Sequence, residues 1–600
     1  MSVLTTLWRL LDRRQRRELL ALQLLSVLMA LSTVGGIAAV LPFFAVLADP
    51  RLVERSAPLR YLTQTLHFTH GNSGGEGFLV ALGIAFATLV VLANAVNLLG
   101  SIMMNRFAFR VGNALRTALF AEYLNRGLAF HSAAHSATLT SKVLHETGRV
   151  TTGILQSGLI LVTNVVTVVF IVASLLFLDP LVAAAAMAGV GASYGSLYLV
   201  VRGRLLRNGL SESRYYAERT QIVGESFGAI KEILLLHAQS LFVARFARSC
   251  RDISRTIVNT LAISQSPRHV LECVTVCALV AVAVYGSGRG AGTWIGQLTF
   301  VGIAAYRLLP ALQLAFAATA RIRADRPALD SIAADLLAAR AHTPKACTAA
   351  AAATWRGRPL EEIRLHAVSY RYAPDVPVAL AEVSLRIPAG AVVGFIGDNG
   401  SGKTTLIDLL AGLLAADSGR VEVDGMVIDA ANRSAWQATI AYVPQQTFLL
   451  DATLAENIAL GVEPAQIDFE RVRSTIGLTR LDECVAALPG GESAVLGERG
   501  CRLSGGQRQR LAIARALYRD ASVLIMDEAT NALDAAAERD IVDALVTQRR
   551  NRTMLLVAHR LSTLRHCDVI FELKGGRLLR SGTYQEVLAR RGARALTVVS

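Results

Sequence analysis

Six long apolar runs occupy the first half of the chain, and they limit its possible folds more than any other feature of the sequence. A helix needs about 20 predominantly apolar residues to cross the ~30 Å hydrocarbon core of a membrane. With their flanking residues, the runs lie near 19–48, 78–104, 154–178, 181–201, 268–288 and 294–320. The fifth reaches the required length only if Arg268 and Glu272 are included in it. This pattern predicts a membrane domain of six transmembrane helices.

Basic residues in the connections predict how these helices are oriented. Arg and Lys are abundant in the N-terminal segment, in the second–third and fourth–fifth connections and directly after the sixth run, whereas the other three connections are poor in charge. By the positive-inside rule, both termini are expected in the cytoplasm, and the number of spans is expected to be even. A secretory signal peptide is the alternative for the first run, but that run is too long and has no clear cleavage site.

The formal net charge of +15 raises a second possibility, because strongly basic chains often bind nucleic acid. Here the excess of Lys and Arg lies beside the apolar runs and is not interleaved with aromatic residues. Cytoplasmic loops that face anionic lipid carry such an excess in any case. We therefore expect the lipid bilayer as a partner and no nucleic acid.

The composition changes after about residue 340, which predicts two domains. Residues 1–340 form the predicted membrane domain, 341–359 an Ala- and Thr-rich linker, and 360–600 a domain in which short Val- and Ile-rich runs alternate with helical patterns. That alternation is typical of an α/β domain with parallel strands. The two cytoplasmic connections are about 50 and 65 residues long and contain few Gly or Pro, so we expect the membrane helices to continue well into the cytoplasm.

A glycine-rich loop follows the first strongly apolar strand pattern of the second domain, at Val392–Ile396, and precedes a helix expected to begin near Lys403. Glycines at these positions allow successive backbone N–H groups to face phosphates at a helix N-terminus. We therefore predict an ATP site in which Lys403 reaches the β- and γ-phosphates and the Thr404 hydroxyl binds Mg²⁺. Its residues are Gly397, Asp398, Asn399, Gly400, Ser401, Gly402, Lys403, Thr404 and Thr405.

A second apolar strand pattern, which begins at Val523, ends in two carboxylates, Asp527 and Glu528. Asp527 is suited to hold Mg²⁺ through water, and Glu528 is suited to orient and deprotonate the water that attacks the γ-phosphate. A pair of capping residues for the next helix is the alternative. The phosphate loop upstream favours the catalytic interpretation.

The sequence Leu503-Ser504-Gly505-Gly506-Gln507 completes a recognisable set. With the phosphate loop and the paired carboxylates, it resembles the signature motif of ATP-binding-cassette (ABC) proteins, and the resemblance covers the whole second domain. It implies that Ser504 and the glycine amides contact ATP held by an opposite subunit, with Gln507 in the same motif. It also implies roles for Tyr372 against adenine, Gln445 at Mg²⁺ and the attacking water, Asp534 in the D-loop and His559 at the γ-phosphate.

The architecture resembles that of ABC exporters, because the predicted spans precede the cassette and Gly497-Glu498-Arg499-Gly500 is similar to the exporters' cross-linking loop. Importers usually keep the two parts on separate chains, and the soluble cassette ATPases of DNA repair lack membrane spans. Only one cassette is present, so the resemblance implies a dimer, most simply a homodimer. Asn531 departs from the family, which usually has a serine there, and this puts details of communication between subunits in doubt.

Two arginines in or beside the spans are the candidates for binding the transported substrate. Charges inside spans are costly, and Arg307 lies about thirteen residues into the sixth run. Arg268 begins the fifth run, where an internal pair with Glu272 is the alternative. The segments Val40–Phe43, 267–272 and Tyr306–Pro310 resemble bacterial flippases for lipid-linked oligosaccharides. The resemblance implies an amphipathic, pyrophosphate-linked glycolipid moved across the bacterial inner membrane. An exporter of a peptide, siderophore or drug-like molecule is the alternative.

Overall fold

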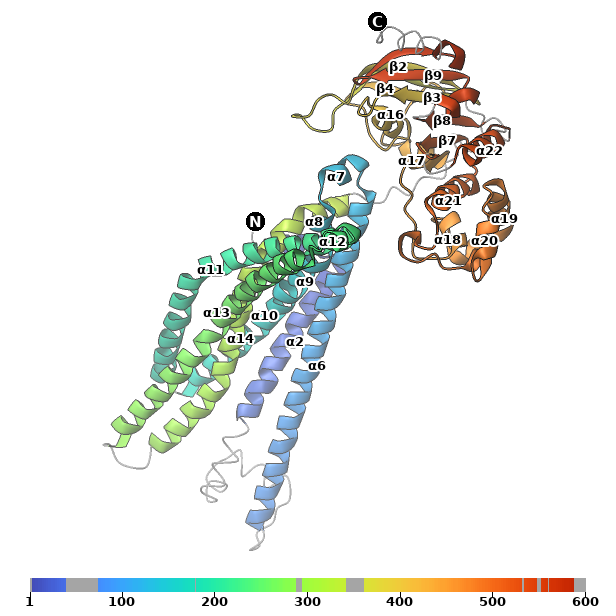
Figure 1. Cartoon of the computed structure of the whole chain (residues 1–600). Coiled ribbons are helices and arrows are strands. Elements are labelled where there is room, and N and C mark those ends of the chain that lie inside the picture. The colour runs from blue at the N-terminus through green and yellow to red at the C-terminus, as the bar shows by residue number, and fades with distance from the viewer. Residues whose placement is uncertain are drawn as a thin grey trace. The chain divides into compact units, whose positions relative to one another are not determined.

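The computed structural model describes residues 3–38, 74–178, 180–287, 294–341, 361–530, 534–547, 552–558 and 561–587. It divides into two compact units (Figure 1). Unit 1 comprises Met1–Arg126 and His131–Thr343, and unit 2 comprises Gly127–Phe130 and Pro344–Ser600. The last ten residues of the predicted first span, the predicted linker after Ala341 and Asp179, between the third and fourth spans, lie outside the described residues, as do Asn531 and His559.

Long helices form unit 1 throughout its described residues. The longest are α6 (Gly74–Asn125), α11 (Pro180–Gly228), α13 (Gln239–Ser287) and α14 (Trp294–Ala341), of 52, 49, 49 and 48 residues. At 1.5 Å per residue they are about 72–78 Å long, more than twice the ~30 Å thickness of the hydrocarbon core. The predicted second and fourth spans lie within α6 and α11, so the prediction that these helices continue far beyond the membrane is confirmed.

The part of the chain that follows α6 is divided into short helical segments. After α7 (Leu128–Ala133) it consists of α8 (Ser136–Ser141), η1 (Lys142–Glu146), α9 (Thr147–Arg149), η2 (Val150–Gln156) and α10 (Ser157–Leu178). The segments η1 and η2 are π-helical. Such turns are rare in proteins and often occur at functional positions.

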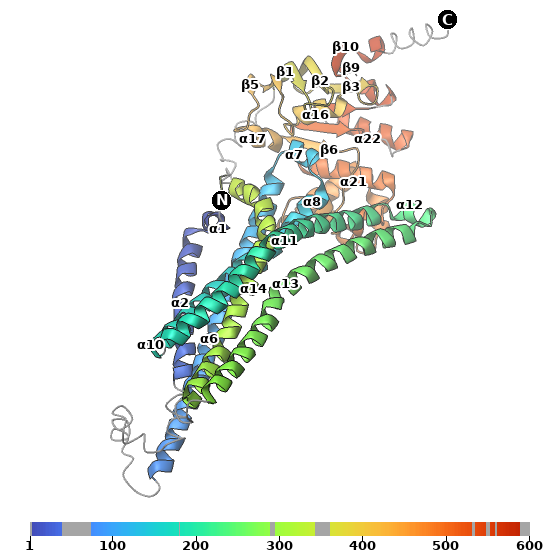
Figure 2. The same ribbon diagram turned by 90° about the vertical axis from the view of Figure 1, so that its left-hand side faces the viewer.

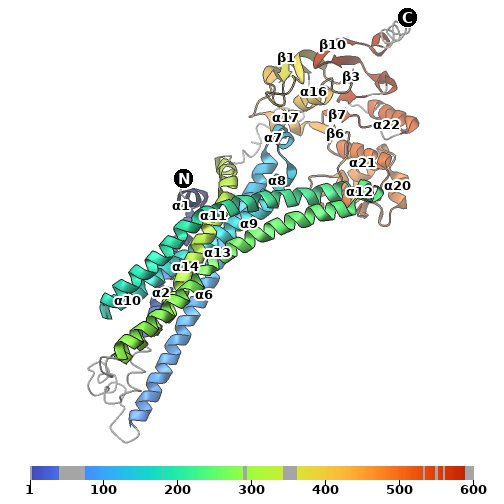
Figure 3. The ribbon, with the colours of Figure 1, turned by 60° about the vertical axis from the view of Figure 1, so that its left-hand side comes forward.

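The helices pack as a bundle with one long pair. Helices α11 and α13 lie side by side and are joined through α12 (Ile230–Leu235), as Figures 2 and 3 show. Buried apolar side chains of α11 and α14 form a core that includes Leu205, Phe316 and Ala324. Two N-terminal helices, α1 (Val3–Leu10) and α2 (Arg13–Ala38), complete the unit. Among the described residues, three stretches are long and apolar enough to cross a membrane, Arg13–Gly35, Val80–Asn125 and Ser136–Ser174.

Two sheets form the strand layer of unit 2. The first is antiparallel, in the order β2-β1-β4-β5, from β1 (Glu362–Tyr370), β2 (Leu380–Pro388), β4 (Ser418–Val423) and β5 (Met426–Val427). The second has the order β10-β9-β3-β8-β7-β6, from β3 (Val392–Gly397), β6 (Ile440–Val443), β7 (Val523–Asp527), β8 (Thr553–Val557), β9 (Val569–Lys574) and β10 (Arg577–Gly582). Its strands are parallel except for β10. The predicted α/β class is confirmed, and the antiparallel sheet is an addition to it.

The helices of unit 2 lie around these sheets and at one end of them (Figure 1). Helix α16 (Lys403–Leu410) packs with Phe395 and Trp436 in a core that both sheets share. A separate helical core contains Leu449, Leu454 and Leu511. The other helices are α17 (Arg433–Ala438), α18 (Leu454–Ile458), α19 (Phe469–Leu478), α20 (Asp482–Ala487), α21 (Gly505–Tyr518) and α22 (Ala535–Thr547), with 3-10 turns at Pro464–Gln466, Gly491–Ser493, Glu498–Gly500 and Leu561–His566.

Strand order explains how the sequence motifs meet. Strands β3, β8, β7 and β6 are consecutive parallel neighbours. Parallel strands end at the same edge of a sheet, where open α/β folds bind their ligands. The phosphate loop follows β3, Asp527 ends β7, Gln445 lies two residues after β6, and His559 lies two residues after β8. The fold therefore brings the phosphate loop, Asp527 and Gln445 to one edge.

Candidate functional site

The phosphate loop has a backbone that requires glycine. Gly397 and Gly402 have φ values of 154° and 98°, in the region that side chains disfavour. A Cβ on Gly397 would lie 2.3 Å from the carbonyl oxygen of Leu573, and one on Gly402 would lie 2.7 Å from that of Ala379. Gly402 directly precedes α16, so the loop leads into the first turn of that helix. The N–H groups of this turn lack partners within the helix and attract anions.

The side chains of the loop are arranged around the place where phosphates are expected. The buried Lys403 ammonium donates to the carbonyl oxygens of Gly397 and Asp398, at 2.9 and 3.0 Å. The Oγ atom of Ser401 is buried and has no hydrogen-bond partner among the described residues. Thr404, at the start of α16, is exposed. A cation held over the loop, an unpaired hydroxyl and an accessible hydroxyl together suit a bound phosphate chain.

The two carboxylates lie where the sequence predicts, at the end of β7. Tyr442 donates its hydroxyl to Asp527 Oδ2 at 3.3 Å, and Gln445 Nε2 donates to Glu528 Oε2 at 2.5 Å. Glu528 has φ of 50°, a left-handed conformation that is uncommon for a residue with a side chain and that often occurs at active sites. The structure therefore brings the predicted base and the predicted glutamine into direct contact.

Donor chemistry at this edge fits Mg²⁺. The Thr404 hydroxyl, the Asp527 carboxylate and the Gln445 amide offer oxygen ligands, which this ion prefers. Among the described residues, no group of three or more His, Cys, Asp or Glu side chains forms a metal site by itself. A set with a single carboxylate is typical of a magnesium ion that also binds phosphate oxygens of the substrate.

Tyr372 lies beside the phosphate loop, although it comes from the segment after β1. Its hydroxyl is 3.1 Å from Thr405 Oγ1, and its ring meets that of Tyr370 edge-on, with 5.0 Å between centroids. The side chain remains 45% exposed. An exposed aromatic face next to a phosphate loop is available for stacking on a nucleotide base.

The signature residues begin α21. Ser504 caps this helix, with its Oγ accepting from Gln507 N at 3.2 Å, while Gln507 Oε1 accepts from Ser504 N at 2.8 Å. This reciprocal capping box presents the start of the helix with Ser504 and Gly505 exposed. Leu503 belongs to the separate helical core, so the signature and the phosphate loop rest on different cores of unit 2.

Asp534 begins α22, where its Oδ1 accepts from the backbone N–H of Ala537 at 2.7 Å and of Ala536 at 3.1 Å. These bonds, first the one to Ala537, lower the pKa of the Asp534 carboxyl. The predicted γ-phosphate residue, His559, and the unusual Asn531 lie outside the described residues. Their predicted roles remain predictions.

Sequence reasoning missed two buried carboxyl groups near the site. Glu538, in α22, accepts hydrogen bonds on Oε1 from Thr530 Oγ1 at 2.7 Å and Thr563 Oγ1 at 2.6 Å. Asp408 lies in α16, where burial and then the charge of Asp527 raise its pKa to about 6. A carboxylate among the apolar residues of Leu406–Leu410 was a visible signal for Asp408, whereas the partners of Glu538 are only apparent in three dimensions.

Of the two arginines predicted to bind the transported substrate, the structure describes the side chain of Arg268 but not that of Arg307. Arg268 Nε donates to Glu272 Oε1 at 2.8 Å within α13, so the internal pair that the spacing predicts is present. The Arg268 side chain is 60% exposed and Pro267 precedes it within the helix. Arg307 lies in α14, and its side chain is outside what the structure describes.

Family comparisons match both halves of the chain. A model of the ABC transporter transmembrane region matches residues 61–308, and a second model, described as ABC transporter, matches residues 380–531. The chain is 32% identical over 495 residues to an ATP-dependent lipid A-core flippase of Polaromonas sp., with 80% of each chain covered. It is 29% identical to the corresponding flippase of Burkholderia orbicola, over 87% of this chain and 86% of the relative.

A shorter segment of the chain matches a relative at higher identity. An ATP-dependent lipid A-core flippase of Ralstonia nicotianae is 43% identical over 232 residues, which is 38% of this chain. Among solved structures, a bacterial Atm1-family ABC exporter with ATP bound superimposes with a TM-score of 0.75 and 24% sequence identity. The match covers 95% of this chain and 97% of that one, so the fold is that of an ABC exporter.

Proposed function

Because this chain belongs to the ABC transporter family, a membrane-spanning family that couples ATP hydrolysis to transport, we propose that it flips an amphipathic lipid with an anionic head across the bacterial inner membrane. The observation that carries the proposal is the similarity to lipid A-core flippases, which extends through both the membrane and the ATPase regions. The resemblance of three membrane segments to flippases of lipid-linked oligosaccharides supports the same class. We place both termini in the cytoplasm, on the distribution of basic residues.

Hydrolysis is assigned to the edge of the parallel sheet. Lys403 and the backbone of the phosphate loop bind the phosphates, and Tyr372 stacks on the base. Glu528 takes the proton of the attacking water, and Gln445, already bonded to Glu528, orients that water. Thr404, Gln445 and Asp527 would hold Mg²⁺, which would supply positive charge next to the phosphate oxygens. His559 contacts the γ-phosphate, and Asp534 belongs to the loop between subunits.

The working unit is proposed to be a homodimer with two composite ATP sites. The exposed start of α21, with Ser504, Gly505 and Gly506, offers a hydroxyl and free helix N–H groups to phosphates from outside its own core. A second copy supplies those phosphates most simply, because each chain carries a phosphate loop and a signature. Thr404, Asp527 and Glu528 are all present in this chain, so neither site needs a different partner.

Arginine residues of the membrane domain are proposed to bind the anionic head of the lipid. Guanidinium groups bind phosphate oxygens through paired hydrogen bonds and stay charged at any accessible pH. Arg307 is the principal candidate, because its side chain is retained inside a predicted span at a cost of about 3 kcal/mol. Arg268 is the second candidate, although one edge of its guanidinium is bonded to Glu272. A peptide, siderophore or drug-like cargo is the competing proposal.

The test is a substrate comparison with the purified protein in proteoliposomes. ATPase activity and movement of labelled lipid between leaflets are measured with a lipid A-core lipid, a polyprenyl-pyrophosphate-linked glycan, a neutral glycolipid and a short peptide. We expect one or both anionic lipids to stimulate hydrolysis and to be moved in an ATP-dependent manner, and the neutral lipid and the peptide to do neither.

Two variants accompany this experiment. Glu528→Gln keeps the size of the side chain and removes the base, so ATP should still bind while turnover falls at least 100-fold, the usual contribution of general base catalysis. Glu463→Gln changes an exposed carboxylate of unit 2 and should leave both activities unchanged. Stimulation by the peptide or the neutral lipid alone would replace the lipid flippase by an exporter of another cargo.

A further inference from the structure

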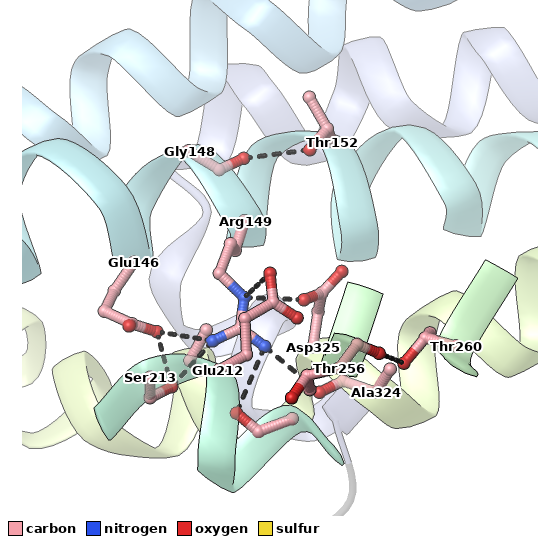
Figure 4. Close-up of polar contacts among 12 residues, drawn as sticks. Glu146, Gly148, Arg149, Thr152, Glu212, Ser213, Thr256, Thr260, Ala324 and Asp325 are labelled. Atoms are coloured by element: carbon pink, nitrogen blue, oxygen red, sulfur yellow. Dashed lines mark hydrogen bonds and ion pairs between the residues drawn. The ribbon is translucent and has the colours of Figure 1, made fainter. Parts of the chain in front are cut away.

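A fully bonded arginine joins three helices of unit 1. Arg149, at the end of α9, donates from Nε to Asp325 Oδ1 at 2.8 Å and from NH1 to Ser213 Oγ at 2.6 Å and Glu146 Oε2 at 3.2 Å. Its NH2 donates to the carbonyl oxygens of Ala324 and Gly209, at 3.3 and 3.4 Å. A guanidinium has five N–H donors, and these five bonds use them all. The acceptors come from η1, α11 and α14, as Figure 4 shows.

Three carboxyl groups surround the single guanidinium of Arg149. Besides Asp325 and Glu146, Glu212 Oε1 lies 3.6 Å from Arg149 Nε, and all four charged side chains are at most 14% exposed. Arg321 acts on Asp325 and Glu212 through its charge. Two guanidiniums thus face three carboxyl groups. If all three were ionised, this buried cluster would carry an uncompensated negative charge, which is strongly unfavourable away from water.

The surroundings supply no further cation to this cluster among the described contacts. On α11, Arg219 lies over the ring of Tyr216, with 5.0 Å to the centroid, and Tyr216 in turn stacks on His145 of η1. From α6, Arg116 donates to Thr147. From α13, the residues drawn in Figure 4 are the uncharged Thr256 and Thr260. One oxygen of Glu146, Oε1, is buried and has no hydrogen-bond partner among the described residues.

Backbone contact makes this junction rigid. A Cβ on Gly209 would lie 1.8 Å from the Ala324 carbonyl oxygen, and one on Gly153 would lie 1.8 Å from Asp325 Oδ2. Helix α11 therefore touches the backbone of α14 at Gly209, and η2 touches the Asp325 side chain of α14 at Gly153. The π-helical segments η1 and η2 flank Arg149 on both sides. A small separation of these helices must break several of the bonds to Arg149 together, because they converge on one planar group.

We propose that Glu146, Arg149, Glu212 and Asp325 form a proton-binding lock, which holds α9, α11 and α14 together while it retains a proton and loosens when that proton leaves. The proton belongs to the cluster as a whole, because strongly coupled carboxyl groups titrate together. The proposal does not rest on the proposed cargo or on ATP binding, because all groups of the cluster belong to unit 1.

The direction of the pH effect follows from the carboxyl groups. Burial raises the pKa of Asp325 and of Glu212, and this effect outweighs the opposing charge of Arg149. A group whose pKa is raised in the packed state stabilises that state below its ordinary pKa, and the contribution is lost as the pH rises through the raised value. The lock is therefore tight in mild acid and weakens toward alkaline pH.

Hydrogen exchange measures this directly on the full chain in lipid nanodiscs without nucleotide. Backbone exchange is followed from pH 5 to 9 in peptides that cover residues 205–216 and 320–328, and each rate is divided by the intrinsic rate at that pH. Release of one proton on opening makes the opening constant rise by up to about tenfold per pH unit. We expect this slope in the wild type, within the part of the range where the cluster titrates.

Conservative variants separate the lock from ordinary packing. Glu212→Gln and Glu146→Gln each leave two carboxyl groups for two guanidiniums, so the slope should flatten and exchange at high pH should slow. Glu225→Gln is the matched control on the same helix, because that carboxylate is exposed and pairs with Arg245 at the surface; it should keep the wild-type slope. A flat wild-type profile, protection that increases with pH, or a wild-type slope in both cluster variants would overturn the proposal.

Discussion

Glu538 is expected to hold two catalytic segments in position, and its replacement gives a quantitative test. The side chain is 4% exposed, and one of its oxygens accepts from Thr530 and from Thr563. Thr530 lies two residues after the proposed base Glu528, and Thr563 lies four residues after His559. A single carboxylate thus connects the chain after β7 to the chain after β8. Glu538→Ala removes both connections.

The loss of stability in Glu538→Ala follows from the two hydrogen bonds that this substitution removes. A hydrogen bond to a charged group contributes about 1.5–3 kcal/mol, and buried hydroxyls left without an acceptor keep the penalty of their desolvation. Two such bonds predict that Glu538→Ala lowers the free energy of unfolding of the ATPase unit by about 3–6 kcal/mol. Glu538→Gln retains one acceptor oxygen and should lose less than half of that amount. Because neither threonine belongs to the residues proposed to bind ATP, kcat should fall while KM for ATP changes little.

Chemical denaturation measures the free energy of unfolding, and steady-state ATPase assays measure kcat and KM. The matched control is Asp540→Ala, on the same helix, whose carboxylate pairs with Arg480 at the surface at 2.5 Å. Exposed pairs contribute about 0–1 kcal/mol, so this variant should be nearly as stable as the wild type. If Glu538→Ala costs no more than Asp540→Ala, or if it raises KM and leaves kcat unchanged, Glu538 does not position the catalytic segments.

Two further predictions concern the dimer and the cargo. When Ser504→Arg chains are mixed in equal amounts with wild-type chains, about a quarter of the dimers should have both composite sites intact, so ATPase activity should fall more steeply than the mutant fraction. A strictly proportional fall, with mixed dimers shown to form, would contradict sites that are shared between chains. Arg307→Ala should abolish lipid-stimulated hydrolysis and retain basal ATPase activity, and Arg307→Lys should restore stimulation only in part, because an ammonium does not provide the paired donors of a guanidinium. Wild-type stimulation in both Arg307 variants would remove this residue from the cargo site.

The ATPase fold could be predicted because the motifs that identify it each occupy a short, continuous stretch of sequence. The phosphate loop requires a strand, three glycines and a helix within about 20 residues, and the structure has β3, Gly397, Gly402 and α16 in that order. Asp527 and Glu528 could be placed because a buried strand ends there. The membrane helices could be predicted from length and hydropathy, and the continuation of α6 and α11 from the absence of turn signals.

Contacts between distant segments could not be predicted in the same way. Arg149 and Asp325 are separated by 176 residues, and no spacing rule relates them. Their sequence neighbours suggest a charged cytoplasmic surface, whereas the structure buries both side chains. The antiparallel sheet was missed for a similar reason, because β1 pairs with β4 across the intervening β2 and β3. The role of Glu538 depends on two threonines that lie in different loops.

The place of the Arg149 cluster along α11 has a mechanical consequence. Glu212 lies 32 residues from the start of this 49-residue helix and 16 from its end, which is about 48 Å and 24 Å of helix. Held at that point, the helix acts as a lever with unequal arms. When the end near Gly228 moves by 1 Å, the end near Pro180 moves about twice as far in the opposite direction. The strength of the cluster then decides whether the helix pivots there or slides, and hence how much of a movement reaches the far end.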